Sequence, residues 1–264
     1  MVRFAANLNF LFTETPFLDR FELAKRHGFE AVEYPFPYEN PEDELARRLR
    51  EHGLTQALIN LPAGDWGKGE RGIACHPGRT EEFREGVATA IRYAQALDCP
   101  RANCLAGVKP EGVSDEAAQA ALVENLRYAG QAFREAGLQL LTEPINTRDI
   151  PGFFLNTSAQ GLAVMEAVGD GLVGLQYDAY HMQIMEGDLA RTVEENLDVI
   201  GHIQIADNPG RHEPGTGEVN YPFFLDHLDA IGYEGWVGCE YAPATTTEAG
   251  LGWLAEYRAS EGAS

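Results

Sequence analysis

The sequence predicts a single (β/α)8 barrel that takes in residues 1–264. This length is close to the roughly 250 residues that such a barrel uses. Short apolar runs alternate eight times with segments of helical periodicity, which indicates parallel strands joined by helices. Polar residues lie near the ends of four of these runs, at separations of 35, 26 and 36 residues. A doubly wound open sheet is the alternative, but no glycine-rich phosphate turn follows the first strand.

The strands are predicted from short runs of apolar residues that are bounded by glycine, proline or aspartate. Their continuous apolar character is typical of parallel strands that are buried on both faces. In chain order, these runs are Arg3–Leu8, Ala31–Tyr34, Thr55–Leu61, Arg101–Leu105, Leu138–Thr142, Val173–Tyr177, Ile200–Ile205 and Trp236–Cys239.

The helices are predicted from apolar residues at spacings of three and four and from signals at the helix ends. Gly28, Gly53 and Gly137 follow the first, second and fourth helices, where a left-handed residue ends a helix well. Ser114 opens the fourth helix as a capping residue. The predicted helices are 16–27, 41–52, 81–97, 114–136, 158–168, 189–197, 221–231 and 247–257, and a short polar tail follows.

Two long loops after strands are candidates for function, because scaffold loops usually carry it. The glycine-rich segment from Pro62 to Gly78 follows the third strand, and Arg71 and Arg79 are possible anchors there for an anionic substrate. The segment QIADNPGRHEPGTGEVNY contains the loop after the seventh strand. Its Arg211 carries a guanidinium fork that matches the two oxygens of a carboxylate.

The charge and composition exclude several classes of partner. A formal charge of −21 repels nucleic acid and anionic membranes, so neither is expected as a partner. An anionic small substrate would need a local cation. No apolar run approaches the ~20 residues of a membrane span, and the N-terminus lacks the apolar stretch of a secretory signal. We therefore expect a cytoplasmic protein with reduced cysteines, since the four cysteines show no C-x-x-C spacing. Whether it forms a homo-oligomer is left open.

Four polar residues at the ends of successive strands predict a metal site. Glu143, Asp178, Gln204 and Glu240 lie at or next to the ends of the last four apolar runs. A barrel brings such strand ends to one mouth, where three carboxylates repel one another unless a cation lies among them. Three carboxylates and one amide form an oxygen-rich ligand set, which suits one Mg²⁺ or Mn²⁺ ion.

Three further polar residues near this mouth have less specific roles. His181 lies just beyond the sixth strand, where it is either a donor to a substrate oxygen or a histidine of a surface loop. His202 would lie one layer below Gln204, and it is more often a core histidine than a ligand. Glu33 ends the second strand and is assigned a structural hydrogen-bonding role.

Several long motifs resemble the hydroxypyruvate isomerase branch of the sugar isomerase/epimerase barrels, which are related in fold to endonuclease IV. These motifs are NLPAGDWGKGERGIACHPGR, ENLRYA, EPIN, the D-x-x-H of Asp178 to His181, HIQIADNPGRHEPGTGEVNY and GWVGCEY. The resemblance extends over nearly the whole chain. The histidine-rich three-zinc site of endonuclease IV is absent from the sequence.

The resemblance implies roles for individual residues. Glu143 and Glu240 match the acid/base pair that moves the proton, and together with Asp178 and Gln204 they match the metal positions. Ketose 3-epimerases usually carry a histidine where this chain has Gln204. His181 and Arg211 match substrate contacts, although the length of the Arg211 loop differs from that of the epimerases. Asp149 stands where the epimerases carry a glutamate, six residues after the first catalytic glutamate.

The resemblance therefore implies an intramolecular oxidoreductase that acts on a small anionic hydroxy- or oxo-acid. The expected reaction interconverts hydroxypyruvate and 2-hydroxy-3-oxopropanoate through an enediolate. No nicotinamide, flavin or nucleotide cofactor is expected, because the reaction is redox-neutral. Isomerisation of 2-oxo-tetronate and 3-epimerisation of a ketose are alternatives that would use the same metal and glutamates. A sugar-acid binding module without turnover is the alternative from another class.

Overall fold

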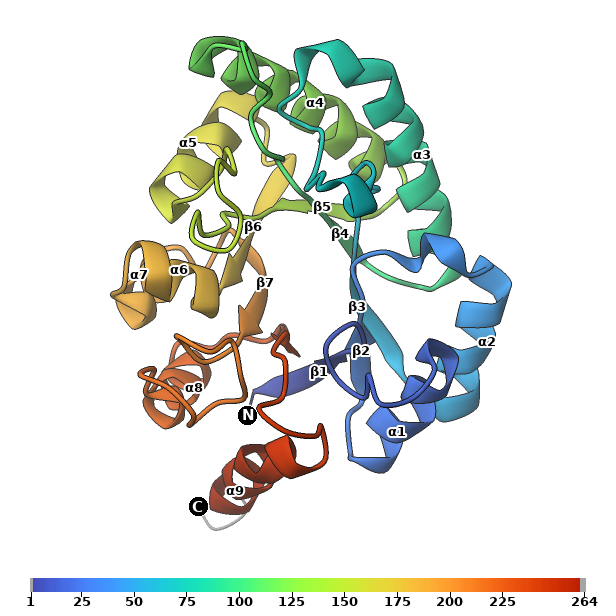
Figure 1. The fold of residues 1–264 in the computed structure, drawn as a ribbon, viewed down its shortest axis with the longest axis vertical. Coiled ribbons are helices and arrows are strands. Elements are labelled where there is room, and N and C mark those ends of the chain that lie inside the picture. The colour runs from blue at the N-terminus through green and yellow to red at the C-terminus, as the bar shows by residue number, and fades with distance from the viewer. Residues whose placement is uncertain (1, 262–264) are drawn as a thin grey trace.

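The computed structural model describes residues 2–261 as a closed barrel of eight parallel strands in chain order, with helices around the outside (Figure 1). All eight predicted strands are present, and their bounds differ from the predicted ones by at most one residue. They are β1 (Arg3–Asn7), β2 (Ala31–Glu33), β3 (Thr55–Asn60), β4 (Arg101–Cys104), β5 (Gln139–Thr142), β6 (Val173–Asp178), β7 (Ile200–Ile205) and β8 (Trp236–Cys239).

The helices confirm most of the predicted ranges. They are α1 (Arg20–Arg26), α2 (Glu42–His52), α3 (Thr80–Ala96), α4 (Asp115–Glu135), α5 (Ser158–Val168), α6 (Ala179–Met185), α7 (Leu189–Glu195), α8 (Tyr221–Ala230) and α9 (Gly252–Glu261). Short 3₁₀ turns lie at Phe17–Asp19, Pro37–Glu39, Trp66–Lys68, Pro77–Arg79 and Ala249–Leu251.

Three helix predictions need correction. The first helix begins with a 3₁₀ turn, so α1 starts only at Arg20. The last helix begins at Gly252 and runs on to Glu261, where the sequence had predicted a polar tail. The sequence also missed α6, which begins directly after the last residue of β6 with no turn between them.

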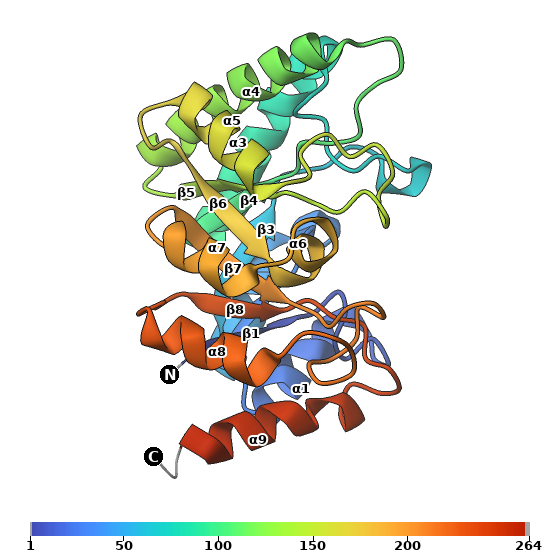
Figure 2. The same ribbon diagram turned by 90° about the vertical axis from the view of Figure 1, so that its left-hand side faces the viewer.

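The barrel places its long loops and its chain ends at opposite sides. Figure 2 shows both termini at the left of the barrel and the longer connections at the right, beyond the carboxyl ends of the strands. This is the end at which barrel enzymes bind their substrates. No helix within residues 2–261 is long and apolar enough to span a bilayer.

A polar layer inside the barrel lies beneath that end. Glu33 on β2 is 1% exposed and accepts hydrogen bonds from Asn7, His202 and Gln204. Gly238 on β8 makes room for it, since a Cβ atom there would collide with both carboxylate oxygens of Glu33. A larger residue at this position would therefore displace the group that supports the site above it.

Candidate active site

The four predicted metal residues lie at the carboxyl ends of the last four strands. Glu143 follows β5 directly and Glu240 follows β8, whereas Asp178 is the last residue of β6. Gln204 is the next-to-last residue of β7 and the register partner of Asp178. All four are at most 8% exposed. The barrel thus turns residues that are far apart in sequence into one buried cluster.

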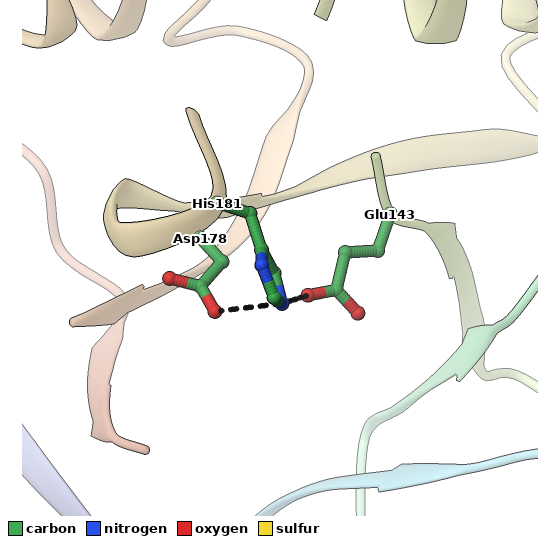
Figure 3. A group of neighbouring side chains, drawn as sticks. All are labelled: Glu143, Asp178 and His181. Carbon is green, nitrogen blue, oxygen red and sulfur yellow. Dashed lines mark ion pairs between the residues drawn. The ribbon is translucent and has the colours of Figure 1, made fainter. Parts of the chain in front are cut away.

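The short helix α6 brings His181 into this cluster. Asp178 caps the helix, because its Oδ1 accepts a hydrogen bond from the backbone N of Tyr180 at 2.8 Å. His181 Nε2 lies 3.5 Å from Asp178 Oδ2 and 4.0 Å from Glu143 Oε1 (Figure 3). His181 is 2% exposed, so the alternative of a surface-loop histidine is wrong.

These residues suit a metal ion. Glu143, Asp178 and His181 each offer one ligand atom, and the three atoms lie within 4.8 Å of one another. Asp178 Oδ2 is buried and has no hydrogen-bond partner among the described residues. A buried carboxylate oxygen without a donor is unfavourable, and a divalent cation would satisfy it.

Burial controls the protonation of the three carboxyl groups. It raises the pKa of Glu143 well above the usual range, and the charges of Glu240 and Asp178 raise it further. Burial also raises the pKa of Asp178 to about 6 and that of Glu240 to about 8, although the nearby charge of Arg211 opposes both shifts. Carboxyl groups with a raised pKa can accept and return a proton near neutral pH.

Arg211 lies against the same carboxylates. Its Nη2 donates to Glu240 Oε2 at 2.7 Å and lies 4.0 Å from Asp178 Oδ2. The guanidinium carbon lies 4.9 Å from the ring centre of Phe10 and 5.0 Å from that of Tyr180. The cation is therefore held at the barrel mouth by both charge and aromatic rings.

The loop that carries Arg211 is organised by a buried aspartate. Asp207 accepts hydrogen bonds from the backbone N atoms of Gly215, Gly217 and Val219 at 2.9, 2.8 and 3.1 Å. Arg211 itself has a φ of 54°, a left-handed conformation that is unfavourable for a residue with a side chain. The loop thus holds Arg211 in a backbone conformation that directs its side chain to the mouth.

Gln204 connects the carboxylate cluster to the polar layer below. Its Nε2 donates to Glu33 Oε1 at 2.7 Å, and its Oε1 accepts from Gln176 Nε2 at 2.6 Å. His202 Nε2 lies 2.6 Å from Glu33 Oε2, so His202 is a core histidine as expected. The structural role predicted for Glu33 is confirmed, because its carboxylate orients the amide of Gln204.

A network beside His181 contains residues that the sequence did not single out. Asp149 Oδ2 accepts hydrogen bonds from Tyr180 Oη at 2.9 Å and from Asn146 Nδ2 at 3.1 Å. Asn103 Nδ2, on β4, donates to Glu143 Oε2 at 2.7 Å. Asn103 and Asn146 lie at the end of a strand or soon after one, and this position is the signal that could have identified them.

The two arginines of the loop after β3 are engaged elsewhere. Arg79 forms ion pairs with Glu70 and Glu82, and the guanidinium of Arg71 lies 4.0 Å from the ring centre of Trp66. Both arginines therefore hold the loop, and neither is among the residues that line the cavity described next. Arg211 is the better candidate for a substrate anchor.

Glu143 and Glu240 face a cavity of about 810 Å³ at the barrel mouth. Glu143, His181, Arg211 and Glu240 line its polar part, and aromatic residues that include Phe36 and Trp66 line another part. This volume accommodates a small hydroxy-acid with room to spare. The arrangement can bind an anion through Arg211 and move a proton through the buried glutamates.

Comparison with known proteins agrees with this geometry. Residues 21–257 match the family model of the xylose isomerase-like TIM barrel. The chain is 55% identical to a hydroxypyruvate isomerase of Escherichia coli over 98% of this chain and 100% of that protein. The chain belongs to this barrel family. The prediction of a sugar isomerase/epimerase barrel is thereby confirmed.

Other relatives in the family have different names. A 2-oxo-tetronate isomerase of Cupriavidus necator is 48% identical, with 97% of this chain and 99% of that protein covered. The crystal structure of an AP endonuclease of family 2 from Brucella melitensis is 47% identical and superposes with a TM-score of 0.95, covering 97% of this chain and 99% of that one.

Proposed function

We propose that this protein is a hydroxypyruvate isomerase that interconverts hydroxypyruvate and 2-hydroxy-3-oxopropanoate. The observation that carries the proposal is the pair of buried glutamates, Glu143 and Glu240, in one cavity with an arginine. The 55% identical relative bears the name of this activity. Both lines of evidence favour an isomerase over a binding module, because a module without turnover does not need two glutamates at the substrate cavity.

We further propose that Glu143, Asp178, Gln204 and Glu240 hold one divalent ion, Mg²⁺ or Mn²⁺. When bound, such an ion polarises a carbonyl and stabilises negative charge that develops on oxygen. The chain itself brings three carboxylates together and leaves Asp178 Oδ2 without a hydrogen-bond donor among the residues that the structure describes. Glu33 contributes by orienting Gln204.

The proton transfer is assigned to the glutamates. In the forward direction one carboxylate removes a proton from C3 of hydroxypyruvate, and the electron pair forms the C2–C3 double bond of the enediolate. A proton then returns to C2, and the hydroxyl proton of O3 passes to O2. Glu143 and Glu240 follow strands β5 and β8, which is consistent with proton transfer on two sides of the substrate.

Arg211 is proposed to bind the carboxylate of the substrate. Within residues 2–261, its guanidinium donates one side-chain hydrogen bond, to Glu240, and its carbon lies over two aromatic rings. The fork of the guanidinium can therefore turn its remaining N–H groups to two carboxylate oxygens. Asp149 lies 4.0 Å from Arg211 Nη1 and is proposed to keep this side chain in place.

Isomerisation of 2-oxo-tetronate is the second candidate function. It is favoured by the cavity of about 810 Å³, which is larger than a three-carbon acid requires, and by the 48% identical relative of that name. The cytoplasmic location, the single-domain organisation and the identity of the metal stay predictions.

Product analysis with the purified protein tests the proposal. The protein is incubated with Mg²⁺ or Mn²⁺ and, in separate reactions, with hydroxypyruvate, 2-oxo-tetronate and several ketoses. The highest kcat/KM is expected for hydroxypyruvate. A higher value for 2-oxo-tetronate would transfer the assignment to the second function, and turnover of ketoses alone would overturn both.

A further inference from the structure

Asn146 is a buried side chain whose amide orientation is fixed by the backbone. It is fully buried in the loop after β5. Its Oδ1 accepts hydrogen bonds from the backbone N atoms of Arg148 and Asp149 at 3.0 and 2.8 Å. Its Nδ2 therefore faces the other way, where it donates to Asp149 Oδ2 at 3.1 Å. Exchanging the amide oxygen and nitrogen would set Nδ2 against two donors and Oδ1 against a carboxylate.

The same Nδ2 lies 2.6 Å from Nδ1 of His181. An amide nitrogen has two hydrogens to donate and accepts nothing, so Nδ1 must be the acceptor of this bond. A neutral imidazole carries one proton, which must then be on Nε2. The Nε2–H group lies beside Asp178 Oδ2 and Glu143 Oε1, at 3.5 and 4.0 Å.

We propose that Asn146 is a positioning residue that keeps the proton of His181 on Nε2, so that His181 donates a hydrogen bond to a substrate oxygen and does not bind the metal. The proton on Nε2 occupies the lone pair that a metal would need. Glu143, Asp178 and His181 form a possible ligand triad by distance, but Asn146 removes His181 from it. Only the identity of the substrate oxygen rests on the proposed function.

The hydrogen bonds also fix the charge of the ring. Nδ2 of Asn146 can only donate to Nδ1 of His181, so Nδ1 carries no proton and the ring is neutral in this arrangement. A neutral imidazole with a fixed proton can donate to O2 of the substrate in both directions of the reaction. The opposite tautomer would present a lone pair to the developing negative charge and repel it.

Nitrogen NMR of the metal-free protein tests the proposal directly. Long-range ¹H–¹⁵N spectra of protein with ¹⁵N-labelled histidine distinguish the two tautomers, and the spectrum of His181→Gln assigns the signal among the seven histidines. We expect an unprotonated Nδ1 and a protonated Nε2 at pH 7. Mg²⁺ should leave Nε2 protonated. A proton on Nδ1, or loss of the Nε2 proton when Mg²⁺ binds, would overturn the proposal.

A charge-matched pair of variants tests the role of Asn146. Asn146→Asp combined with Asp149→Asn exchanges the amide and the carboxylate, so that the net charge and the number of hydrogen-bonding groups are conserved. The carboxylate introduced at position 146 would accept a hydrogen bond from His181, and we expect Nδ1 to become protonated. Asp149→Asn alone is the control and should keep the proton on Nε2. The same tautomer in all three proteins would show that Asn146 does not set it.

These readouts are independent of the substrate assignment. The NMR spectra require neither substrate nor turnover. They can therefore contradict the proposed tautomer while hydroxypyruvate is still converted, and they can support the tautomer when hydroxypyruvate is not converted. If the double variant does not fold, the wild-type spectra with and without Mg²⁺ still decide whether Nε2 carries the proton.

Discussion

At the scale of single residues, the site depends on carboxylates that are buried close together. Glu143, Asp178 and Glu240 are at most 8% exposed, and burial raises the pKa of each. Arg211 is the cation that offsets part of their charge in the protein alone. The chemistry that we propose uses the same feature, because a carboxyl group with a raised pKa is a better proton carrier near neutral pH.

Replacing either glutamate by glutamine tests this role. Glu240→Gln and Glu143→Gln keep an oxygen that can bind a metal but cannot accept a proton. Each should lower kcat by ~10²- to 10⁴-fold, the usual contribution of general acid-base catalysis. Steady-state kinetics at confirmed metal content measures this. Glu81→Gln, a change of an exposed glutamate on α3, is the control and should have wild-type kcat. Near-normal turnover by either site variant would leave that glutamate as a ligand only.

Arg211→Ala tests the proposed carboxylate anchor. The KM for hydroxypyruvate should rise more than kcat falls, since an anchor binds ground and transition states about equally. The variant should also bind Mn²⁺ more tightly, by roughly tenfold or about 1.4 kcal/mol, because the carboxylates lose a competing cation. Isothermal titration and kinetics measure both effects. Arg47→Ala on α2 is the control. Unchanged Mn²⁺ affinity would mean that Arg211 does not compete for the carboxylates.

The site residues differ in how far the sequence could predict them. Glu143, Asp178 and Glu240 stand out because a carboxylate at the end of an apolar strand needs a partner. Asn146 offers only its position soon after a strand, which is a weak signal, since asparagine is common in loops and its contact with His181 depends on a helix that the sequence missed. The pairing of Arg211 with Glu240 joins two loops, and no local pattern contains that information.

At the scale of elements, the strands were predictable and the short connections were not. The eight strands are short apolar runs, so each can be predicted from its own residues. By contrast, α6 is only seven residues long and owes its place to the cap of Asp178 and to burial against the barrel. The beginning of α1 and the end of α9 were misplaced for a similar reason, because helix ends are determined by a few contacts.

Gly238→Ala tests how β8 supports the site. The added Cβ atom would collide with the carboxylate oxygens of Glu33 and displace them. We expect a loss of about 1–3 kcal/mol in the free energy of unfolding, as for other overpacked cores, together with weaker metal binding. Chemical denaturation and Mn²⁺ titration measure the two effects. Gly252→Ala in α9 meets no atom within 4 Å and should not destabilise the protein. Equal stability of the two variants would contradict the support role.

At the scale of the whole molecule, the buried carboxylates make stability depend on pH. A pKa raised in the folded state gives stability that is present below the unfolded pKa and is lost as the pH rises through the folded value. For Glu240 this window runs from the ordinary value of 4.5 to about 8. In metal-free protein, the Tm of the wild type minus that of Glu240→Gln should therefore decrease as the pH rises from 4.5 to about 8. A Tm difference that does not change with pH would show that the buried charge of Glu240 does not destabilise the folded protein.

Deuterium incorporation by the wild-type protein tests the central claim most directly. Hydroxypyruvate is incubated in D₂O with the protein and Mg²⁺ or Mn²⁺ and followed by ¹H NMR, with chelator-treated protein as the matched control. We predict that 2-hydroxy-3-oxopropanoate forms and that its C2 position carries solvent deuterium, while the chelated protein forms neither product nor label. Product without deuterium at C2 would contradict proton exchange through the glutamates. Absence of both product and exchange in metal-loaded protein would contradict the proposed function.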